Sequence, residues 1–338
     1  MNIPAFRAIT GHGEVIRHLR NAIASDRISH AYLITGEAGS GKRTMADALA
    51  AALVCTSPTP DHDACGECLA CRKLRSHNHQ DVIRIEHEKP GVITVDEVRS
   101  QLVGTIGLRP GESGRKVYIV PDAEKMNPQA QNAILKTIEE PPSYAVIILL
   151  AESEEALLPT ILSRCVRLPL MPLADRLVRD YLERELQLPD YEARILTAAA
   201  QGSIGKAVSL ASDEAVSERR REVLSLLARL PSLNTAETAQ RAQHFKEEKE
   251  HMNEILDTML LFYRDVYVIK TGGRDDSLVL YQEAEAIREA AGAMSYSGLL
   301  HVTEELDRAR VRIGANVNPE LTMEVLLLAI RSAMKGNT

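Results

Sequence analysis

The sequence is poor in aromatic residues. Among its 338 residues there is no Trp, and there are only 3 Phe and 9 Tyr. The core must therefore be built mainly from Leu, Ile, Val, Ala and Met, which favours packing between helices. The shortage also leaves few rings on which single-stranded bases could stack.

Positive charge is also in deficit. The 47 acidic residues outnumber the 40 basic ones, and the formal net charge is −7. A protein that binds DNA mainly through its own surface is usually basic. Any contact with nucleic acid is therefore expected to be local or shared with other chains.

Long apolar runs are missing as well. No stretch approaches the roughly 20 apolar residues that cross a bilayer. The first residues, MNIPAFRAITGHGE, lack the basic and then apolar order of a signal peptide. We therefore expect a cytoplasmic protein with no membrane partner. In that reducing environment the five cysteines are expected to bind metal where they cluster, and not to form disulfides.

The first half alternates apolar strand-like runs with amphipathic helix-like runs. Strands are predicted at 31–35, 82–85, 117–120 and 146–150, and helices at 16–25, 43–53 and 128–139. Such alternation predicts an α/β fold, in which helices cover both faces of a parallel sheet. At roughly 150 residues per domain, the length leaves room for one or two further units.

After residue 168 the pattern becomes helical only. A proline-bounded connector, PLMPL, is followed by a helical segment over 175–211. Further helical periodicity covers 214–230, 236–269, 278–291 and 296–313. Asn318 and Pro319 suit the cap and first position of a last helix. Three domains are predicted: α/β over 1–168, a small helical domain over 169–212, and an all-helical domain over 213–338.

A glycine-rich segment, GEAGSGK, lies between a predicted strand and a predicted helix. This is the context of a phosphate-binding loop. Gly36, Gly39 and Gly41 would let backbone amides converge on phosphate oxygens, with help from the helix N-terminus. Lys42 would reach the outer phosphates. The alternative is an ordinary glycine turn before a helix.

The residue after the lysine of this loop is unusual. A working loop has Ser or Thr there, whose hydroxyl binds Mg²⁺, but this sequence has Arg43. Thr44 is rotated by about 100° around the helix and should not substitute directly. The loop could therefore hold ATP or ADP through its phosphates and still lack a magnesium ligand.

Several segments carry a family resemblance: SHAYLITGEAGSGK, NAILKTIEEPP, ILSRC and NVNPELTMEVLLLAI. They resemble the bacterial clamp-loader AAA+ family, which includes gamma/tau and delta-prime subunits of DNA polymerase III. The resemblance spans essentially the whole chain and implies an AAA+ P-loop core, a helical lid and a C-terminal collar. It also implies a hetero-oligomer with gamma/tau and delta subunits that loads a sliding clamp onto primed DNA.

The chain departs from this family at positions that serve its own nucleotide. The family's metal-binding Asp, catalytic Glu, phosphate-sensing Thr and lid Arg fall at Pro121, at Asp122, near Ala151 and Glu152, and at Gly205. With Arg43, both expected magnesium-ligand positions are lost. Without those ligands the charge on a transferring phosphoryl group is poorly stabilised. We expect no intrinsic ATPase, within a complex that belongs to a DNA-directed DNA polymerase.

Ser163 and Arg164 of the ILSRC segment remain intact. In the family this arginine reaches the nucleotide site of a neighbouring subunit, where an arginine finger contributes roughly 10³ or more in rate. Parts that serve this chain's own site are lost, while the part that serves a neighbour remains. The pattern resembles the delta-prime branch. The alternative for Arg164 is a surface salt bridge.

Two other functions stay open. The first is an ATP-hydrolysing subunit of the gamma/tau kind, which Lys42 favours and which Arg43, Pro121 and Gly205 oppose. The second is a zinc-dependent DNA-binding module, which the acidic charge and the shortage of aromatic residues oppose.

Four cysteines form the pattern C-x9-C-x2-C-x2-C: Cys55, Cys65, Cys68 and Cys71. Four thiolates at short spacing suit a tetrahedral Zn²⁺, and a fully Cys-ligated ion has no open position and is structural. The sequence thus predicts a zinc module at about 55–71, inserted into the α/β domain. Free or paired cysteines are the alternative.

Other potential metal ligands lie near this cluster. His62 could replace one cysteine, and His77 and His79 could form a second site with Asp81. The alternative for these two histidines is a loop before the strand at 82–85. Cys165 lies outside the cluster and is expected to be a small buried residue.

Overall fold

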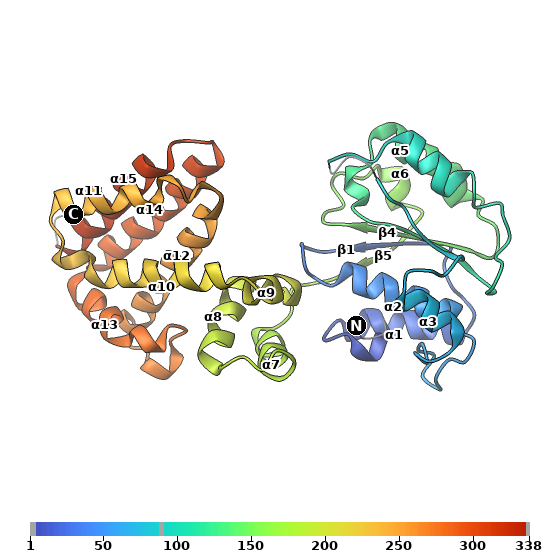
Figure 1. The fold of residues 1–338 in the computed structure, drawn as a ribbon, viewed down its shortest axis with the longest axis horizontal. Coiled ribbons are helices and arrows are strands. Elements are labelled where there is room, and N and C mark those ends of the chain that lie inside the picture. Colours follow the sequence, from blue (N-terminus) through green and yellow to red (C-terminus); the bar gives the residue numbers. More distant parts are fainter. Residues whose placement is uncertain (1–4, 88–90, 336–338) are drawn as a thin grey trace. The chain divides into compact units, whose positions relative to one another are not determined.

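A computed structural model describes residues 5–87 and 91–335. The chain forms two compact units (Figure 1). Unit 1 comprises Met1–Tyr181 and Gly202–Lys206, and unit 2 comprises Leu182–Gln201 and Ala207–Thr338. The predicted boundaries after residues 168 and 212 stay predictions. Within the described residues, no helix is long and apolar enough to cross a membrane.

Unit 1 contains a parallel five-stranded sheet with the strand order β2-β3-β4-β1-β5. The strands are β1 (Ala31–Thr35), β2 (Val82–Arg84), β3 (Lys116–Val120), β4 (Ala145–Ala151) and β5 (Val166–Pro169). The predicted α/β fold is confirmed, and β1 has the predicted bounds. No strand was predicted at β5. It pairs with β1 alone, and an edge strand tolerates a proline such as Pro169.

Both faces of the sheet are buried, as the uninterrupted apolar strands require. On β1, Tyr32 and Ile34 belong to the core on one face, and Leu33 belongs to the core on the other. Leu33 pairs with Leu149 of β4, which lies in the same core. Successive side chains therefore alternate between two helical layers.

Helices form the two outer layers of unit 1 (Figure 1). Residues of α1, α2 and α3 pack on one face of the sheet, and those of α4, α5 and α6 on the other. Their bounds are α1 (Gly13–Ala24), α2 (Lys42–Val54), α3 (Leu69–Arg75), α4 (Val95–Val98), α5 (Pro128–Glu139) and α6 (Pro159–Leu162). Helix α5 has the predicted bounds. Helices α7 (Asp175–Glu185) and α9 (Ile204–Ala211) belong partly to each unit.

Unit 2 is built from helices around one apolar core, which confirms the predicted helical C-terminal region. Its other helices are α8 (Asp190–Ala200), α10 (Glu214–Arg229), α11 (Thr235–Ala242), α12 (Met252–Lys270), α13 (Ala284–Ala293), α14 (Tyr296–Gly314) and α15 (Pro319–Met334). The predicted cap of α15 is confirmed, since the Asn318 side chain accepts hydrogen bonds from the amides of Glu320 and Leu321.

Two predicted helices of unit 2 were wrong in extent. The stretch 236–269 is not one helix, because α11 ends at Ala242 and α12 begins at Met252. The charged residues 246–250 supply no apolar face there, and only Phe245 of that region is inserted into the core. The helix predicted from Leu278 begins at Ala284. Leu278 is buried without being α-helical, so its burial imitates a helical pattern.

Candidate functional site

The glycine loop joins β1 to α2, as the phosphate-loop pattern predicts. Gly39 and Gly41 have φ angles of 75° and 94°, a left-handed conformation that favours glycine. The Lys42 ammonium donates hydrogen bonds to the carbonyl oxygens of Gly36 at 2.5 Å and Glu37 at 2.9 Å. Its side chain therefore lies across the loop that it would serve in phosphate binding.

The electrostatic surroundings of Lys42 are acidic. Burial lowers the pKa of its ammonium group. Three nearby carboxylates act in the opposite direction: Glu152, Glu124 and Asp122. These carboxylates stabilise a charged lysine, but they would also repel a polyphosphate that arrived without a metal ion.

The segment Gly202–Lys206 lies directly against the glycine loop. The Gly205 amide donates to the Gly39 carbonyl at 3.0 Å, and the Ser203 hydroxyl donates to the Ala38 carbonyl at 3.0 Å. A Cβ atom on Gly205 would lie 2.7 Å from the Cα of Gly39. The position where the family has a lid arginine therefore holds a residue that packs on the loop backbone.

The two expected magnesium-ligand positions offer no oxygen from their side chains. Arg43 and Thr44 are exposed at the start of α2, and Pro121 directly follows β3. Asp122 comes next, and its carboxylate is 3.1 Å from the Lys125 ammonium and 3.9 Å from the His87 ring. A lysine partner at this distance competes with a metal ion for the carboxylate.

Arg164 lies between α6 and β5. Its guanidinium is 2.6 Å from a carboxylate oxygen of Glu139, at the end of α5. It also donates to the Thr160 carbonyl at 2.9 Å and the Ser163 hydroxyl at 3.1 Å. Both members of the ion pair are partly exposed. The contact is the salt bridge that the sequence left open, and it also orients a guanidinium that solvent can reach.

The four predicted cysteine ligands do come together. Their sulfur atoms all lie within 4.8 Å of one another, and each cysteine is free of disulfides. The Cys55–Cys68 and Cys65–Cys71 sulfur pairs are each 3.9 Å apart. Tetrahedral coordination at ~2.3 Å per metal–sulfur bond places sulfurs ~3.8 Å apart. The cluster can therefore hold a metal ion and is compatible with Zn²⁺.

Backbone amides point at these sulfur atoms. Amides of Cys65 and Cys68 donate to the sulfurs of Cys55 and Cys65, each at 3.3 Å. Hydrogen bonds from the amides of Cys68 and Glu67 lower the pKa of the Cys65 thiol. Such bonds stabilise thiolates, the form that binds metal. The exposed His62 is not among the clustered ligand atoms.

The second metal site is not supported. The His79 ring accepts a hydrogen bond from the Asp81 amide. Both Asp81 oxygens are used, because they accept hydrogen bonds from the amides of Gly111, Glu112 and Ser113. Within residues 5–87 and 91–335, the four cysteines form the only group of three or more potential ligands. His77 and His79 therefore belong to the loop before β2.

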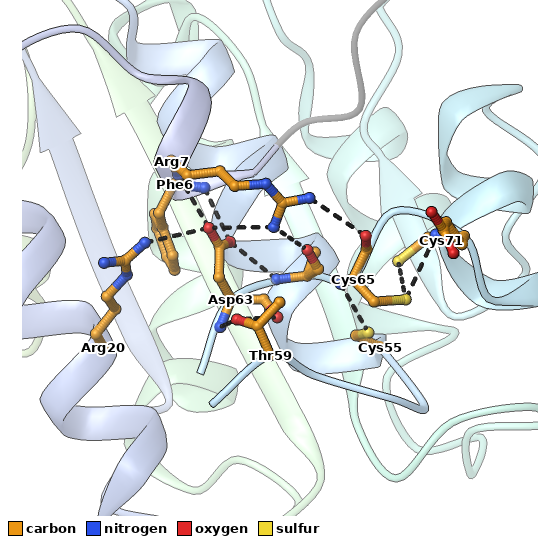
Figure 2. A network of polar contacts seen from close by, with 10 residues as sticks. Phe6, Arg7, Arg20, Cys55, Thr59, Asp63, Cys65 and Cys71 are labelled. Carbon is orange, nitrogen blue, oxygen red and sulfur yellow. Dashed lines mark hydrogen bonds and ion pairs between the residues drawn. The ribbon is translucent and has the colours of Figure 1, made fainter. Parts of the chain in front are cut away.

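A buried carboxylate that sequence reasoning missed lies next to the cysteine cluster (Figure 2). Asp63 is 1% exposed and accepts hydrogen bonds from the amides of Phe6 and Arg7, each at 2.9 Å. Arg20 of α1 reaches the same carboxylate at 3.2 Å. The Arg7 guanidinium in turn donates to the Cys65 carbonyl at 3.2 Å. Asp63 thus connects the segment between Cys55 and Cys71, called here the cysteine loop, to the N-terminal segment and to α1.

Two family models place the chain in a class of protein, the DNA polymerase III subunits. Residues 11–174 match the family model described as "DNA polymerase III, delta subunit". Residues 215–332 match the model described as "DNA polymerase III, delta subunit, C terminal". The two matches cover most of both the α/β region and the helical region.

Individual relatives show which kind of DNA polymerase III subunit the chain resembles. A Bacillus subtilis "DNA polymerase III subunit delta'" is 31% identical, over 94% of this chain and 95% of its own. A Pseudomonas aeruginosa "DNA polymerase III subunit delta'" is 39% identical over 60% of this chain and 61% of its own. The chain belongs to the DNA polymerase III delta-prime family. The resemblance found in the sequence is therefore confirmed.

More distant relatives carry other subunit names. A Bacillus subtilis "DNA polymerase III subunit tau" is 26% identical over 96% of this chain and 61% of its own. Among solved structures, a gamma-subunit-related protein of Thermotoga maritima aligns with 94% of this chain and 99% of its own. It is 24% identical, with a TM-score of 0.39.

Proposed function

We propose that this chain is a delta-prime-type clamp-loader subunit that hydrolyses no ATP in its own site and supplies Arg164 to the site of a neighbour. One observation carries the proposal: Arg43 and Pro121 occupy the two positions at which the family resemblance places magnesium ligands. Phosphoryl transfer depends on metal and arginine charges around the transferring group. Relatives named delta-prime and tau support the setting in DNA polymerase III.

The absence of ATP hydrolysis is tested with the purified chain, and the Lys42→Ala variant gives the background rate. We expect ATP turnover, with or without primed DNA, to equal that of the Lys42→Ala variant. Loss of the lysine removes any phosphate-loop catalysis without touching Arg164. DNA-stimulated turnover that Lys42→Ala abolishes would contradict the proposal and favour the gamma/tau-like alternative, which the loop geometry around Lys42 supports.

The arginine-finger part is tested in a complex reconstituted with tau and delta subunits. Arg164→Ala is expected to slow ATP turnover and clamp loading by about tenfold or more, because a finger contributes roughly 10³ at the site it serves. The control is Arg167→Ala, which removes a side chain of the same charge three residues away that is more exposed, at 57% against 36%. Equal effects of the two substitutions would count against Arg164.

Unit 2 is proposed to bind the neighbouring subunits as a collar. Large apolar side chains are exposed on α14 (Tyr296, Leu300, Val311) and on α15 (Leu321, Val325). Tyr296 and Leu300 are four residues apart and share one helix face. We expect Leu300→Asp to prevent co-purification with tau and delta, whereas Leu108→Asp in unit 1, at 62% exposed against 61%, should not.

The proposal extends to the metal and to the domain division. The ion at the four cysteines is taken to be a structural Zn²⁺. The chain would act in the cytoplasm and reach the sliding clamp and primed DNA through the complex. Residues 1–168, 169–212 and 213–338 would serve as core, lid and collar. Metal analysis of the purified chain, with one zinc per chain expected, tests the first point.

A further inference from the structure

Unit 1 contains a cavity of about 860 Å³. Its walls come from α2, from α3 and the residues after it, and from the ends of β2 and β3. A volume of this size falls within the roughly 300–1,000 Å³ of small-molecule sites. The loop glycines and Lys42 do not line it. The cavity therefore adjoins the phosphate loop through Arg43 and Thr44 but is not built from the loop glycines or Lys42.

The lining of this cavity carries positive charge. Arg43, Arg75 and Arg84 all contribute to it, and so do Asp47 and Glu86. The Arg84 guanidinium is 2.7 Å from the Asp47 carboxylate, so these two charges compensate each other. Two arginines then remain against the exposed Glu86. Two histidines also line the cavity, His77 and His87, and the His87 ring lies 3.9 Å from the Asp122 carboxylate.

Arg43 and Arg75 have no partner among the residues that the structure describes. Across residues 5–87 and 91–335, neither guanidinium makes an ion pair or a hydrogen bond to a side chain or carbonyl. Both side chains are exposed, one at the start of α2 and the other at the end of α3. A guanidinium offers planar donors that match phosphate oxygens in pairs. Two such groups on one cavity form a potential anion site.

The location of Arg43 makes phosphate the best match among anions. Arg43 and Pro121, the two positions from which a phosphate-loop ATPase holds Mg²⁺, both line this cavity. In such an ATPase the metal supplies the positive charge that phosphate oxygens need. Here a guanidinium with permanent charge occupies the first position, so no divalent cation is required.

Part of the lining is apolar. Leu74 and Ile119 are buried apolar residues of the lining, and Tyr181 also lines the cavity. Small-molecule sites combine such surface with a few polar groups that fix orientation. The cavity therefore suits a phosphate attached to a larger molecule as well as a free phosphate or pyrophosphate ion.

We propose that this cavity binds a phosphate-bearing small molecule without a divalent metal, through Arg43 and Arg75. The site goes beyond the proposed clamp-loader function, and it shares with that proposal the placement of Arg43 and Pro121 at the magnesium-ligand positions. The ligand's phosphate could come from an inorganic ion or from a nucleotide. Separate titrations distinguish these sources.

The test is isothermal titration calorimetry on the full chain, with no added divalent cation. The probes are inorganic phosphate, pyrophosphate, AMP and ATP. We expect at least one to bind, with an affinity that added Mg²⁺ does not raise and that added salt weakens. The double substitution Arg43→Ala with Arg75→Ala should weaken binding by tenfold or more. Arg17→Ala, an exposed arginine of α1 outside the cavity, should leave it unchanged.

A second variant separates the cavity from the phosphate loop. Because Lys42 does not line the cavity, a probe bound in the phosphate loop should lose affinity in Lys42→Ala, whereas a probe bound in the cavity should lose it in the double arginine variant. Thermal unfolding of each variant checks that it is folded. The proposal is overturned by binding that requires Mg²⁺, by binding that only Lys42→Ala abolishes, or by no binding of any probe at millimolar concentration. Arginine-dependent binding of DNA alone would also overturn it. None of these results bears on Arg164.

Discussion

The amide of Gly205 donates a hydrogen bond to the carbonyl of Gly39 at 3.0 Å, and neither residue has room for a side chain. A Cβ atom on Gly39 would lie 2.6 Å from the Ser203 hydroxyl and 2.7 Å from the Lys206 amide nitrogen. The phosphate loop and the start of α9 are therefore fitted to each other through their backbones. Returning a lid arginine to this place would disturb the loop that it should serve.

Substitution of Gly205 tests this packing. Gly205→Ala and Gly205→Arg both place a Cβ atom 2.7 Å from the Cα of Gly39, and overpacking of this kind costs about 1–3 kcal/mol. We expect a lower free energy of unfolding in urea denaturation, with no gain of ATP turnover. Lys206→Ala is the control, because this exposed side chain lies one residue away. Hydrolysis by Gly205→Arg would show that the loop can adapt.

The Asp63 carboxylate accepts hydrogen bonds from the amides of Phe6 and Arg7, so its loss should loosen the N-terminal segment. Asp63→Ala leaves the buried amide of Phe6 and the partly buried amide of Arg7 without an acceptor and removes the partner of Arg20. Breaking a buried charged contact costs about 3 kcal/mol or more. Hydrogen exchange at the amides of residues 6 and 7 should become faster.

The matched control for this experiment is Asp61→Asn. Asp61 lies two residues away, is exposed, and makes no hydrogen bond or ion pair among the described residues. It should leave both exchange and stability unchanged. Slow exchange at residue 6 in Asp63→Ala would mean that other contacts hold the N-terminal segment.

Some features of the molecule could be predicted from sequence because they depend on neighbours along the chain. Strand β1 is a short apolar run bounded by turn residues, and α5 begins with a capping Asn127 and Pro128. The cysteine spacing likewise brings the sulfur atoms of Cys65, Cys68 and Cys71 together over a loop and the first turn of α3. Local patterns of this kind leave few alternatives.

The features that could not be predicted depend on contacts between residues far apart in the sequence. Gly205 contacts Gly39 across 166 positions, and Asp63 contacts Phe6 across 57. Without the fold, Asp63 is one acidic residue in a polar loop, and Gly205 is one glycine at a helix start. The break between α11 and α12 was missed because buried Phe245 continues the apolar pattern beyond the helix end.

Removal of the proposed metal should act through the same contacts as loss of Asp63. We expect chelation or Cys65→Ser to lower the unfolding temperature and to speed exchange at residues 6 and 7, because the Cys65 carbonyl accepts a hydrogen bond from Arg7. Cys165→Ser is the control. Burial raises the pKa of the Cys165 thiol to about 11, so this thiol stays protonated at neutral pH and is a poor ligand.

The metal content of each variant tests whether these changes in stability and exchange come from loss of the metal. Cys165→Ser should retain the full amount of metal measured by plasma mass spectrometry, and Cys65→Ser should lose it. A Cys65→Ser variant that keeps wild-type stability and exchange would show that the cysteine loop is held without metal.

Stability should depend on Asp81 in a pH-dependent way. Burial acts to raise the pKa of its carboxyl, but hydrogen bonds from Gly111, Glu112 and Ser113 outweigh burial and lower it. A lowered pKa in the folded state stabilises the protein above the unfolded value of about 3.9. This stabilisation is lost as the pH falls through the pKa of the folded state.

The measurement is urea denaturation of wild type and Asp81→Asn between pH 3 and pH 7. We expect the variant to be less stable by about 2 kcal/mol at pH 7 and the difference to shrink below pH 4. Asp61→Asn should show no such trend, because its side chain makes no hydrogen bond among the described residues. A difference that is independent of pH would point to packing at residue 81.

Arg164 allows a structural role and a role in a neighbouring subunit to be told apart. An exposed ion pair such as Arg164 with Glu139 contributes about 0–1 kcal/mol to stability. Arg164→Ala and Glu139→Gln should therefore change the free energy of unfolding by similar, small amounts. If the guanidinium serves another subunit's nucleotide, only Arg164→Ala should slow ATP turnover of the assembled complex.

The conservative variant sharpens this distinction. Arg164→Lys keeps the charge and can still reach Glu139, but it lacks the planar fork that contacts phosphate oxygens in pairs. We expect its unfolding free energy to match wild type and its complex to turn over ATP nearly as slowly as the alanine variant. A finger acts through geometry as well as charge, whereas a surface salt bridge needs charge alone. Full rescue by lysine would therefore assign Arg164 to the salt bridge.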